Sequence, residues 1–170
     1  MNHGKRRAGV VLCAAFALVA CGPETGTGFS QITPVTTAAT AAPGAMEEEA
    51  QIIALINAER AKQGLGAFSY NAALTKAAQR HASDLAAQNY FSHTGKDGSS
   101  VGERVRAVGY GYCYVSENLS GGYPTAQQAV IGWMQSTGHR ANILSSKAQD
   151  IGIGIAPGGL RVAVFAKSCR

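Results

Sequence analysis

The sequence predicts a small α+β domain in which helices come before a closing antiparallel hairpin. Two patterns support this fold class. Residues 74–86 and 126–134 each place apolar side chains at spacings of three and four, which indicates helices with one buried face. Residues 151–155 and 160–167 have the composition of strands and are separated by a Pro-Gly-Gly turn. A chain of 170 residues has room for one such domain once a targeting segment is set aside.

The other elements follow from local signals along the chain. Three consecutive glutamates open a first helix over residues 47–64, because acidic side chains favour the positive end of a helix dipole. Gly64 provides its left-handed end. A short helix is expected over residues 101–108 and a strand over residues 112–116. Gly138 is expected to end the last helix.

The two strands of the closing hairpin differ in character. In residues 151–155 isoleucine alternates with glycine, so one face is apolar and the other lets another part of the chain approach the backbone closely. Residues 160–167 are apolar on both faces, which suits a central strand. We therefore expect the last strand to lie inside the sheet.

The first 20 residues have the three parts of an export signal. Basic residues 5–7 come before an apolar run, residues 10–19, that is too short to span a bilayer as a permanent helix. The run ends in Leu-Val-Ala-Cys, which resembles the bacterial lipobox, so Cys21 is expected to carry a lipid and become the mature N-terminus. The alternative is an ordinary secretory signal with an incidental cysteine. Under the first interpretation the protein is exported and lipid-anchored on the periplasmic or cell-surface side of the envelope, with the membrane as a partner.

After the export signal, the chain has an expected tether and only a small net positive charge. Residues 21–46 are rich in Thr, Ala, Gly and Pro, so we expect a disordered tether before a domain at residues 47–170. Three of the fifteen basic residues belong to the export signal, which leaves twelve basic against ten acidic residues. So small and scattered an excess argues against a nucleic-acid partner. No repeat or charge asymmetry points to an oligomer, and a monomer is expected.

The cysteines agree with export. Cys13 lies in the discarded segment and Cys21 is the lipid acceptor, which leaves Cys113 and Cys169 in the mature domain. A single pair in an exported domain favours a disulfide. Two buried free thiols are the alternative, because spacing alone does not bring the two Cα atoms together.

Residues capable of chemistry are concentrated in three short segments, 89–93, 116–119 and 138–144. These segments supply two histidines and a glutamate at the ends of predicted elements, where a scaffold usually presents functional groups. Two imidazoles and a carboxylate could hold a divalent metal with an open position, which suits zinc. They could equally serve as hydrogen-bonding and acid/base groups in a cleft.

The order of these motifs carries a family resemblance. Ser-Glu-Asn-Leu comes before a tryptophan-containing helix, Gly-His-Arg-x-Asn-Ile-Leu follows it, and an Ile-Gly-Ile-Gly strand comes near the end. This order resembles the bacterial branch of the CAP superfamily, which includes cysteine-rich secretory proteins, antigen 5 and plant pathogenesis-related proteins. The similarity covers residues 48–166, including Asn57 and Arg60 in the first helix. It implies an α-β-α sandwich with a central antiparallel sheet and a surface cleft.

The resemblance also assigns residues to that cleft. Many members carry two histidines and two glutamates there and sometimes bind zinc. His93, Glu117 and His139 match three of these positions and are candidate ligands for zinc or another divalent cation. Glu117 and His139 are also the catalytic candidates. Ser136 stands at the position of the second glutamate and is a fourth cleft residue, while Ser116 replaces the glycine before the first. Loss of a carboxylate should weaken a metal site, because it removes charge and an orienting group.

Each of these residues also has a structural interpretation. His93 could cap a helix end, and Glu117 could be a buried acceptor that organises the loop after it. His139 could place a cation at the negative end of a helix dipole. Arg140 and Asn142 are expected to tie their loop to the body of the domain through hydrogen bonds to the backbone.

Four further residues are interpreted as core. His81 lies on the buried stripe of its helix and is expected to be a core histidine whose hydrogen bonds are satisfied. Tyr90, Phe91 and Trp133 are most simply core aromatics.

Three classes of function remain open on the sequence. The favoured one is a membrane-anchored module that uses its cleft to bind a small molecule, a lipid or an envelope component. The second is a metal-assisted hydrolase, such as a peptidase, in which Glu117 acts as base on a water held by His93 and His139. The chain has no His-Glu-x-x-His motif or nucleophile elbow, which argues against hydrolysis. The third is a purely structural envelope protein.

Overall fold

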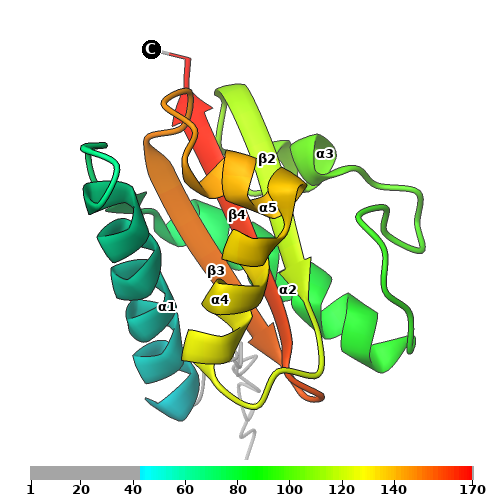
Figure 1. The fold of residues 1–170 in the computed structure, drawn as a ribbon. Helices are drawn as coiled ribbons and strands as arrows, with labels where there is room; N and C mark the ends of the chain where they lie inside the picture. Colours follow the sequence, from blue (N-terminus) through cyan, green and yellow to red (C-terminus); the bar gives the residue numbers. More distant parts are fainter. Residues whose placement is uncertain (1–42, 170) are drawn as a thin grey trace, which may run out of the picture. The chain divides into compact units, whose positions relative to one another are not determined.

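The computed structural model describes residues 43–169, which are drawn in colour in Figure 1. The export signal, Cys21 and most of the predicted tether lie outside the described residues. The elements, in chain order, are α1 (Pro43–Ala61), β1 (Ser69–Tyr70), α2 (Ala72–Ala87), α3 (Val101–Ala107), β2 (Tyr112–Ser120), α4 (Ala126–Gln135), α5 (Thr137–Ile143), β3 (Asp150–Ala156) and β4 (Leu160–Ser168). Within this part of the chain, no helix combines the length and apolar character needed to cross a membrane.

A four-stranded sheet separates two layers of helices. The strand order is β1-β3-β4-β2, with β4 antiparallel to both β2 and β3. α1, α4 and α5 cover one face of the sheet, and α2 and α3 cover the other (Figure 1). This arrangement confirms the predicted α-β-α sandwich and the central place of the last strand. The two-residue β1, which was not predicted, pairs parallel with β3 and makes the sheet mixed.

The hydrophobic core has two parts because β4 is buried on both faces. Ala163 and Phe165 pack with α1 and α4, whereas Val162 and Val164 pack with α2. Trp133 of α4 is buried in the first part, as predicted, and its indole N–H donates to the Leu119 carbonyl at 2.9 Å. The indole therefore ties α4 to the backbone of β2.

α2 lies directly against the glycine face of β3. A side chain at Gly152 would overlap the backbone at Leu74 and Thr75, and one at Gly154 would overlap the backbone at Ala78. The close approach predicted from the alternation of isoleucine and glycine is therefore confirmed.

Arg60 fixes the end of α1 against the chain that leaves α5. Its buried guanidinium donates to the Ile143 and Ser145 carbonyls at 2.7 and 2.9 Å. It also donates to the Gly66 carbonyl at 2.7 Å and stacks 3.6 Å over the Phe68 ring. α5 is thereby held in place from its C-terminal end.

Two predicted helix boundaries are wrong. α1 begins at Pro43 rather than at residue 47, although Gly64 has the positive φ of 68° that was expected after its end. Gly138 does not end the tryptophan helix, because α4 stops at Gln135 and Gly138 lies inside α5. The break is a single extended residue, Ser136, with a φ of −86° and a ψ of 124°.

The predicted strand at residues 112–116 is too short. β2 continues to Ser120 because residues 117–120 pair with residues 161–164 of β4. Glu117 therefore lies inside a strand and does not organise a loop after it.

Phe91 is not a core residue, because its exposed fraction is 58%. The chain leaves α2 through Asn89, whose φ of 49° turns it sharply. Tyr90 then packs half-buried against the core and bonds Asp84 through its hydroxyl, so its neighbour Phe91 points outward.

The predicted disulfide is confirmed. Cys113 and Cys169 are bonded, with Cα atoms 5.0 Å apart. The bond joins the start of β2 to the residue just after β4, so it closes one end of the sheet.

Candidate functional site

Three elements bring the predicted site residues to β2, the edge strand of the sheet. His93 lies in the loop after α2, Glu117 in the middle of β2 and His139 in α5. His93 bonds Glu117 directly, and the His139 carbonyl accepts a hydrogen bond from the Asn118 amide at 3.0 Å. The charge of His93 also acts on the ring of His139. The structure therefore places all three residues around one segment of β2.

The Glu117 carboxylate is buried and both of its oxygens are engaged. Only 2% of the side chain is exposed. Oε1 lies 2.8 Å from His93 Nδ1, and Oε2 accepts from the Arg104 guanidinium at 2.8 Å. A buried carboxylate needs such partners, since desolvation otherwise disfavours its charge.

Arg104 is the site residue that the sequence did not reveal. It lies in α3, whose first turn is set by a capping box between Ser100 and Glu103. Besides Glu117, its guanidinium donates to the Ser99 carbonyl at 2.7 Å and the His93 carbonyl at 3.0 Å. Arg104 therefore holds the loop that carries His93 as well as the carboxylate. The one available signal was that Glu117, if buried, requires a cationic partner, but nothing in the sequence showed which residue supplies it.

The two histidines have opposite electrostatic surroundings. The hydrogen bond to Glu117 raises the pKa of His93, whose side chain is 58% exposed. Burial and the nearby charge of His93 lower the pKa of His139. The site therefore pairs an imidazole whose protonated form is favoured with one whose neutral form is favoured, an arrangement that can hold an anionic group or exchange a proton.

α5 is fastened to β2 by amide side chains. The Asn142 amide donates to Asn118 Oδ1 at 2.9 Å and to the Glu117 carbonyl at 3.3 Å. The expected tie through Asn142 is therefore present, whereas Arg140 is exposed. Ser136 lies at the junction of α4 and α5, where its backbone amide bonds back to α4; its role in the cleft stays a prediction.

The donor set fits zinc poorly. Within residues 43–169, no group of three or more His, Cys, Asp or Glu side chains is placed to hold a metal ion. Glu117 already shares its oxygens with His93 and Arg104, and a guanidinium beside the carboxylate repels a second cation. Zinc binding stays a prediction, and the arrangement of these side chains weighs against it.

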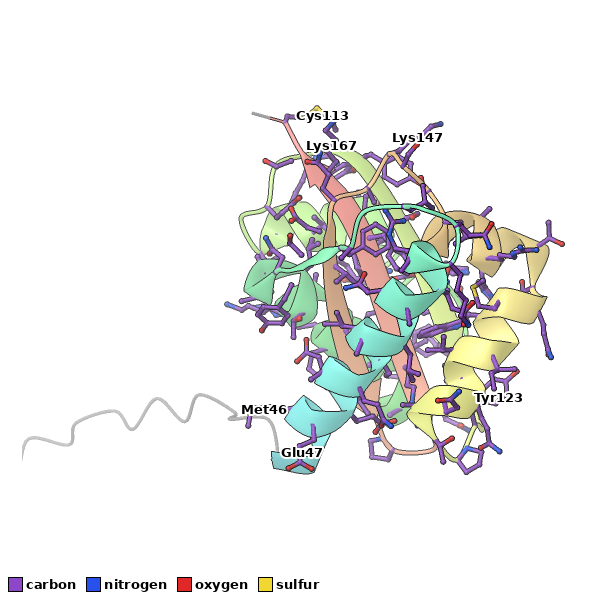
Figure 2. The ribbon with its side chains drawn as sticks, turned by 60° about the vertical axis from the view of Figure 1, so that its left-hand side comes forward. Met46, Glu47, Cys113, Tyr123, Lys147 and Lys167 are labelled. Carbon is purple, nitrogen blue, oxygen red and sulfur yellow. A yellow bond between two sulfur atoms is a disulfide. The ribbon has the colours of Figure 1, made fainter. Side chains whose placement is uncertain are left out.

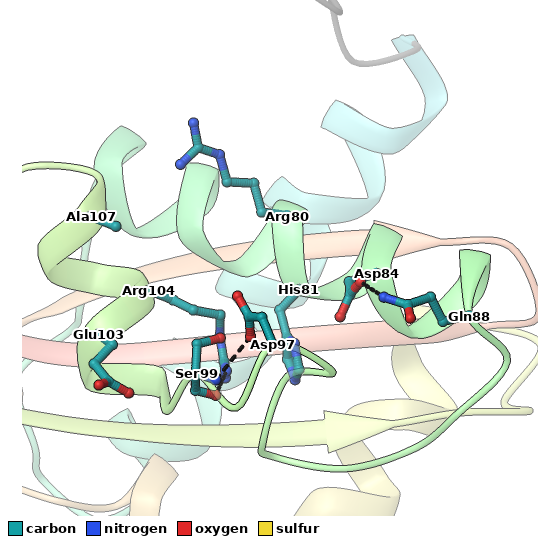
Figure 3. Close-up of a pocket in the computed structure, with 9 residues that line it drawn as sticks. All are labelled: Arg80, His81, Asp84, Gln88, Asp97, Ser99, Glu103, Arg104 and Ala107. Atoms are coloured by element: carbon teal, nitrogen blue, oxygen red, sulfur yellow. Dashed lines mark hydrogen bonds between the residues drawn. The ribbon is translucent and has the colours of Figure 1, made fainter.

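A cavity of about 340 Å³ lies between α2 and α3, and Arg104 is one of the residues that line it (Figure 3). His81 lines this cavity and is nevertheless buried, as predicted for a core histidine. Its Nε2 bonds the Ser92 carbonyl at 2.9 Å, but its buried Nδ1 has no partner among the described residues. The expectation that its hydrogen bonds are all satisfied is therefore half right. Burial lowers the pKa of His81.

Comparison with known proteins agrees with the fold and the motifs. Residues 53–166 match the cysteine-rich secretory protein family, CAP. The chain belongs to this family.

Two curated relatives come from Bacillus subtilis. The chain is 34% identical over 125 residues to the protein YkwD, covering 73% of this chain and 49% of YkwD. It is 33% identical over 107 residues to the membrane protein YlbC, covering 63% of this chain and 31% of YlbC. The chain thus spans half or less of the length of these relatives.

Solved structures share the fold at low sequence identity. An extracellular protein containing a SCP domain from Bacillus anthracis has a TM-score of 0.71 at 24% identity, covering 76% of this chain and 45% of that one. An outer surface protein from Borrelia burgdorferi has a TM-score of 0.66 at 20% identity, covering 75% of this chain and 95% of that one. At these identities the likeness concerns the fold alone.

Proposed function

We propose that this CAP-domain protein is exported, is anchored through a lipid on Cys21, and uses the surface formed by His93 and His139 beside the buried Glu117 to bind a ligand without catalysis. The observation that carries the proposal is the buried Glu117 carboxylate, both of whose oxygens are bonded. A general base needs a lone pair that faces the substrate or its water. Here the carboxylate instead holds two cationic side chains in position.

The ligand chemistry follows from those side chains. Arg104 and Glu117 neutralise each other, so the raised pKa of His93 leaves its exposed imidazolium as the charge offered to a ligand. His139 adds a neutral ring able to donate or accept a hydrogen bond. We infer that the ligand presents an anionic oxygen, as a carboxylate or phosphate group does.

Export is supported by independent features. The disulfide suits an oxidising compartment. Among proteins similar to this chain, one is an extracellular protein, one an outer surface protein and one a membrane protein. The predicted signal and lipid-accepting cysteine agree with that setting.

Thermal denaturation of the purified protein with citrate and with inorganic phosphate tests the binding proposal. A ligand that binds only the folded state raises the Tm, and at a concentration of 100 Kd it adds about 2.7 kcal/mol to the free energy of unfolding. We expect a rise in the wild type that is lost in His93→Gln and His139→Ala. Arg140→Ala, an exposed change on the same helix as His139, should keep it. A rise that survives in both histidine variants would place the binding elsewhere.

Calorimetric titration of zinc separates this proposal from the hydrolase alternative. We expect the metal-stripped wild type to show no binding near micromolar Kd, about −8 kcal/mol. Binding of that strength, abolished in His139→Ala and kept in Arg140→Ala, would overturn the metal-independent interpretation. A proteolysis assay with the same preparations would then test the hydrolase directly.

A further inference from the structure

An exposed apolar patch lies at the end of the domain where the described chain begins. Met46 in the first turn of α1 is 51% exposed, Phe91 after α2 is 58% exposed, and Tyr123 before α4 is 38% exposed. The exposed Pro157 belongs to the turn between β3 and β4. We call these four residues the tether-end patch.

The buried side chain of Arg161 shows that the segments carrying the patch meet at one end of the domain. Its guanidinium donates to the Glu48 carboxylate of α1 at 2.7 Å and to the carbonyls of Tyr123 and Gly159 at 2.9 and 3.0 Å. Phe91 joins the same end, since it lines a groove of about 560 Å³ together with Pro157. Figure 2 shows Met46 and Tyr123 toward this end.

The opposite end of the domain has a different character. Figure 2 shows Cys113, Lys147 and Lys167 there. At the tether-end patch Arg161 is buried and bonded to Glu48, so its charge is neutralised, and Glu47 is exposed next to Met46. A surface that is apolar and slightly acidic suits insertion among uncharged lipid headgroups better than attraction to anionic ones.

We propose that the tether-end patch lies against the lipid bilayer, with Phe91 and Tyr123 entering the interface. The inference rests on the proposed lipid anchor at Cys21. Residues 22–42 connect that anchor to α1, and a chain of this length reaches at most about 75 Å when fully extended. The anchor therefore keeps the start of α1 within that distance of the membrane, and docking would turn the exposed aromatic rings at this end of the domain toward the bilayer. Aromatic side chains favour this interface because their rings are amphipathic or apolar.

Because the domain is tethered to the membrane in this proposal, a small patch is sufficient to dock it against the bilayer. Docking of a tethered domain is an intramolecular step, so its effective concentration is high and few inserted side chains are needed. Because charge contributes little, docking should depend weakly on salt and should not require anionic lipid.

Tryptophan reporters in the lipidated full-length protein test the proposal. Phe91→Trp places an indole in the patch, and Tyr70→Trp, at a 56% exposed position in β1 outside the patch, is the matched control. Both variants keep the buried Trp133 as a common background. Each is reconstituted in phosphatidylcholine vesicles with brominated or ordinary acyl chains. We expect bromine to quench roughly half of the added emission in Phe91→Trp and almost none in Tyr70→Trp, because interfacial indoles sit at headgroup level.

The outcomes distinguish docking from anchoring. The mass of the N-terminal peptide shows whether Cys21 carries lipid. If lipid is present and Phe91→Trp is quenched no more than Tyr70→Trp, the docking proposal is overturned and the anchor stands. If lipid is absent, the anchor fails and the docking proposal falls with it. If Phe91→Trp emission shifts with protein concentration in the absence of vesicles, a second copy covers the patch and the lipid assignment is overturned.

Discussion

At the residue scale, the ion pair between Arg104 and Glu117 organises the site. The pair lies where water solvates both groups poorly, so each depends on the other. His93 bonds the same carboxylate from the solvent side. One buried glutamate thus sets the position of two cationic side chains from different parts of the chain.

Removing the guanidinium should therefore be costly. Arg104→Ala leaves the Glu117 carboxylate buried with one partner, and we expect the free energy of unfolding to fall by about 3 kcal/mol in urea denaturation. Arg106→Ala is the matched control, since this residue of the same helix stacks 4.4 Å over Tyr112, and it should cost below about 1 kcal/mol. Adding Glu117→Gln to Arg104→Ala should recover part of the loss. Equal effects of the two arginine changes would contradict the buried pair.

The raised pKa of His93 predicts a pH-dependent contribution to stability. Because the folded pKa lies above the unfolded one, the contribution is complete below about pH 6.5 and is lost as the pH rises through the folded value. The difference in free energy of unfolding between wild type and His93→Gln should therefore shrink between pH 6 and pH 9, at about 25 °C and fixed salt. The comparison with the variant cancels the opposite contribution of His81, whose pKa is lowered by burial, whereas the repulsion between His93 and His139 belongs to the measured difference. A difference that grows with pH would show that His93 is not held by the carboxylate.

At this scale the sequence revealed the groups of the site but not their pairing. His93 and Glu117 were found because short motifs carry them, and the structure joins them. Arg104 was missed because its motif describes a helix start, and only the packing of α3 on β2 brings it to the carboxylate. Phe91 was wrongly predicted to be a core residue. The sequence does not show the sharp turn at Asn89, after which the side chain of Phe91 is exposed.

At the scale of elements, the packing of α2 on β3 depends on glycine. Gly154→Ala would force the backbone at Ala78 away from the sheet, and we expect a loss of about 3 kcal/mol in the free energy of unfolding. Gly111→Ala is the control, because nothing lies within 4 Å of an added methyl there, and it should change stability by less than about 0.5 kcal/mol. Equal midpoints for the two variants in urea would show that α2 does not rest on the strand backbone.

Periodic elements were predictable and short ones were not. α2 and the closing hairpin follow from their apolar spacing, which the packing on both faces of the sheet enforces. β1 has only two residues, and it forms a strand because it pairs with β3 at the edge of the sheet. α5 has seven residues, and the break that starts it depends on the single extended Ser136, which no local pattern marks.

At the scale of the whole molecule, the disulfide restrains the sheet. It closes a loop with a sequence separation of 56, for which loop entropy gives a stabilisation of roughly 4 kcal/mol. The double variant Cys113→Ser and Cys169→Ser should therefore unfold at a lower urea concentration than the wild type. Adding a thiol reductant to the wild type should lower its midpoint similarly and leave the variant unchanged. Insensitivity of the wild-type midpoint to reductant would contradict the prediction.

The side chains that bond the edge strand have a consequence for how the folded protein behaves at high concentration. β2 forms one edge of the sheet, and its Glu117 and Leu119 carbonyls accept hydrogen bonds from Asn142 and Trp133. An extended strand from another molecule would have to displace both bonds to pair there. The contacts that position the site therefore also protect the folded domain from growing into an aggregate through its sheet edge.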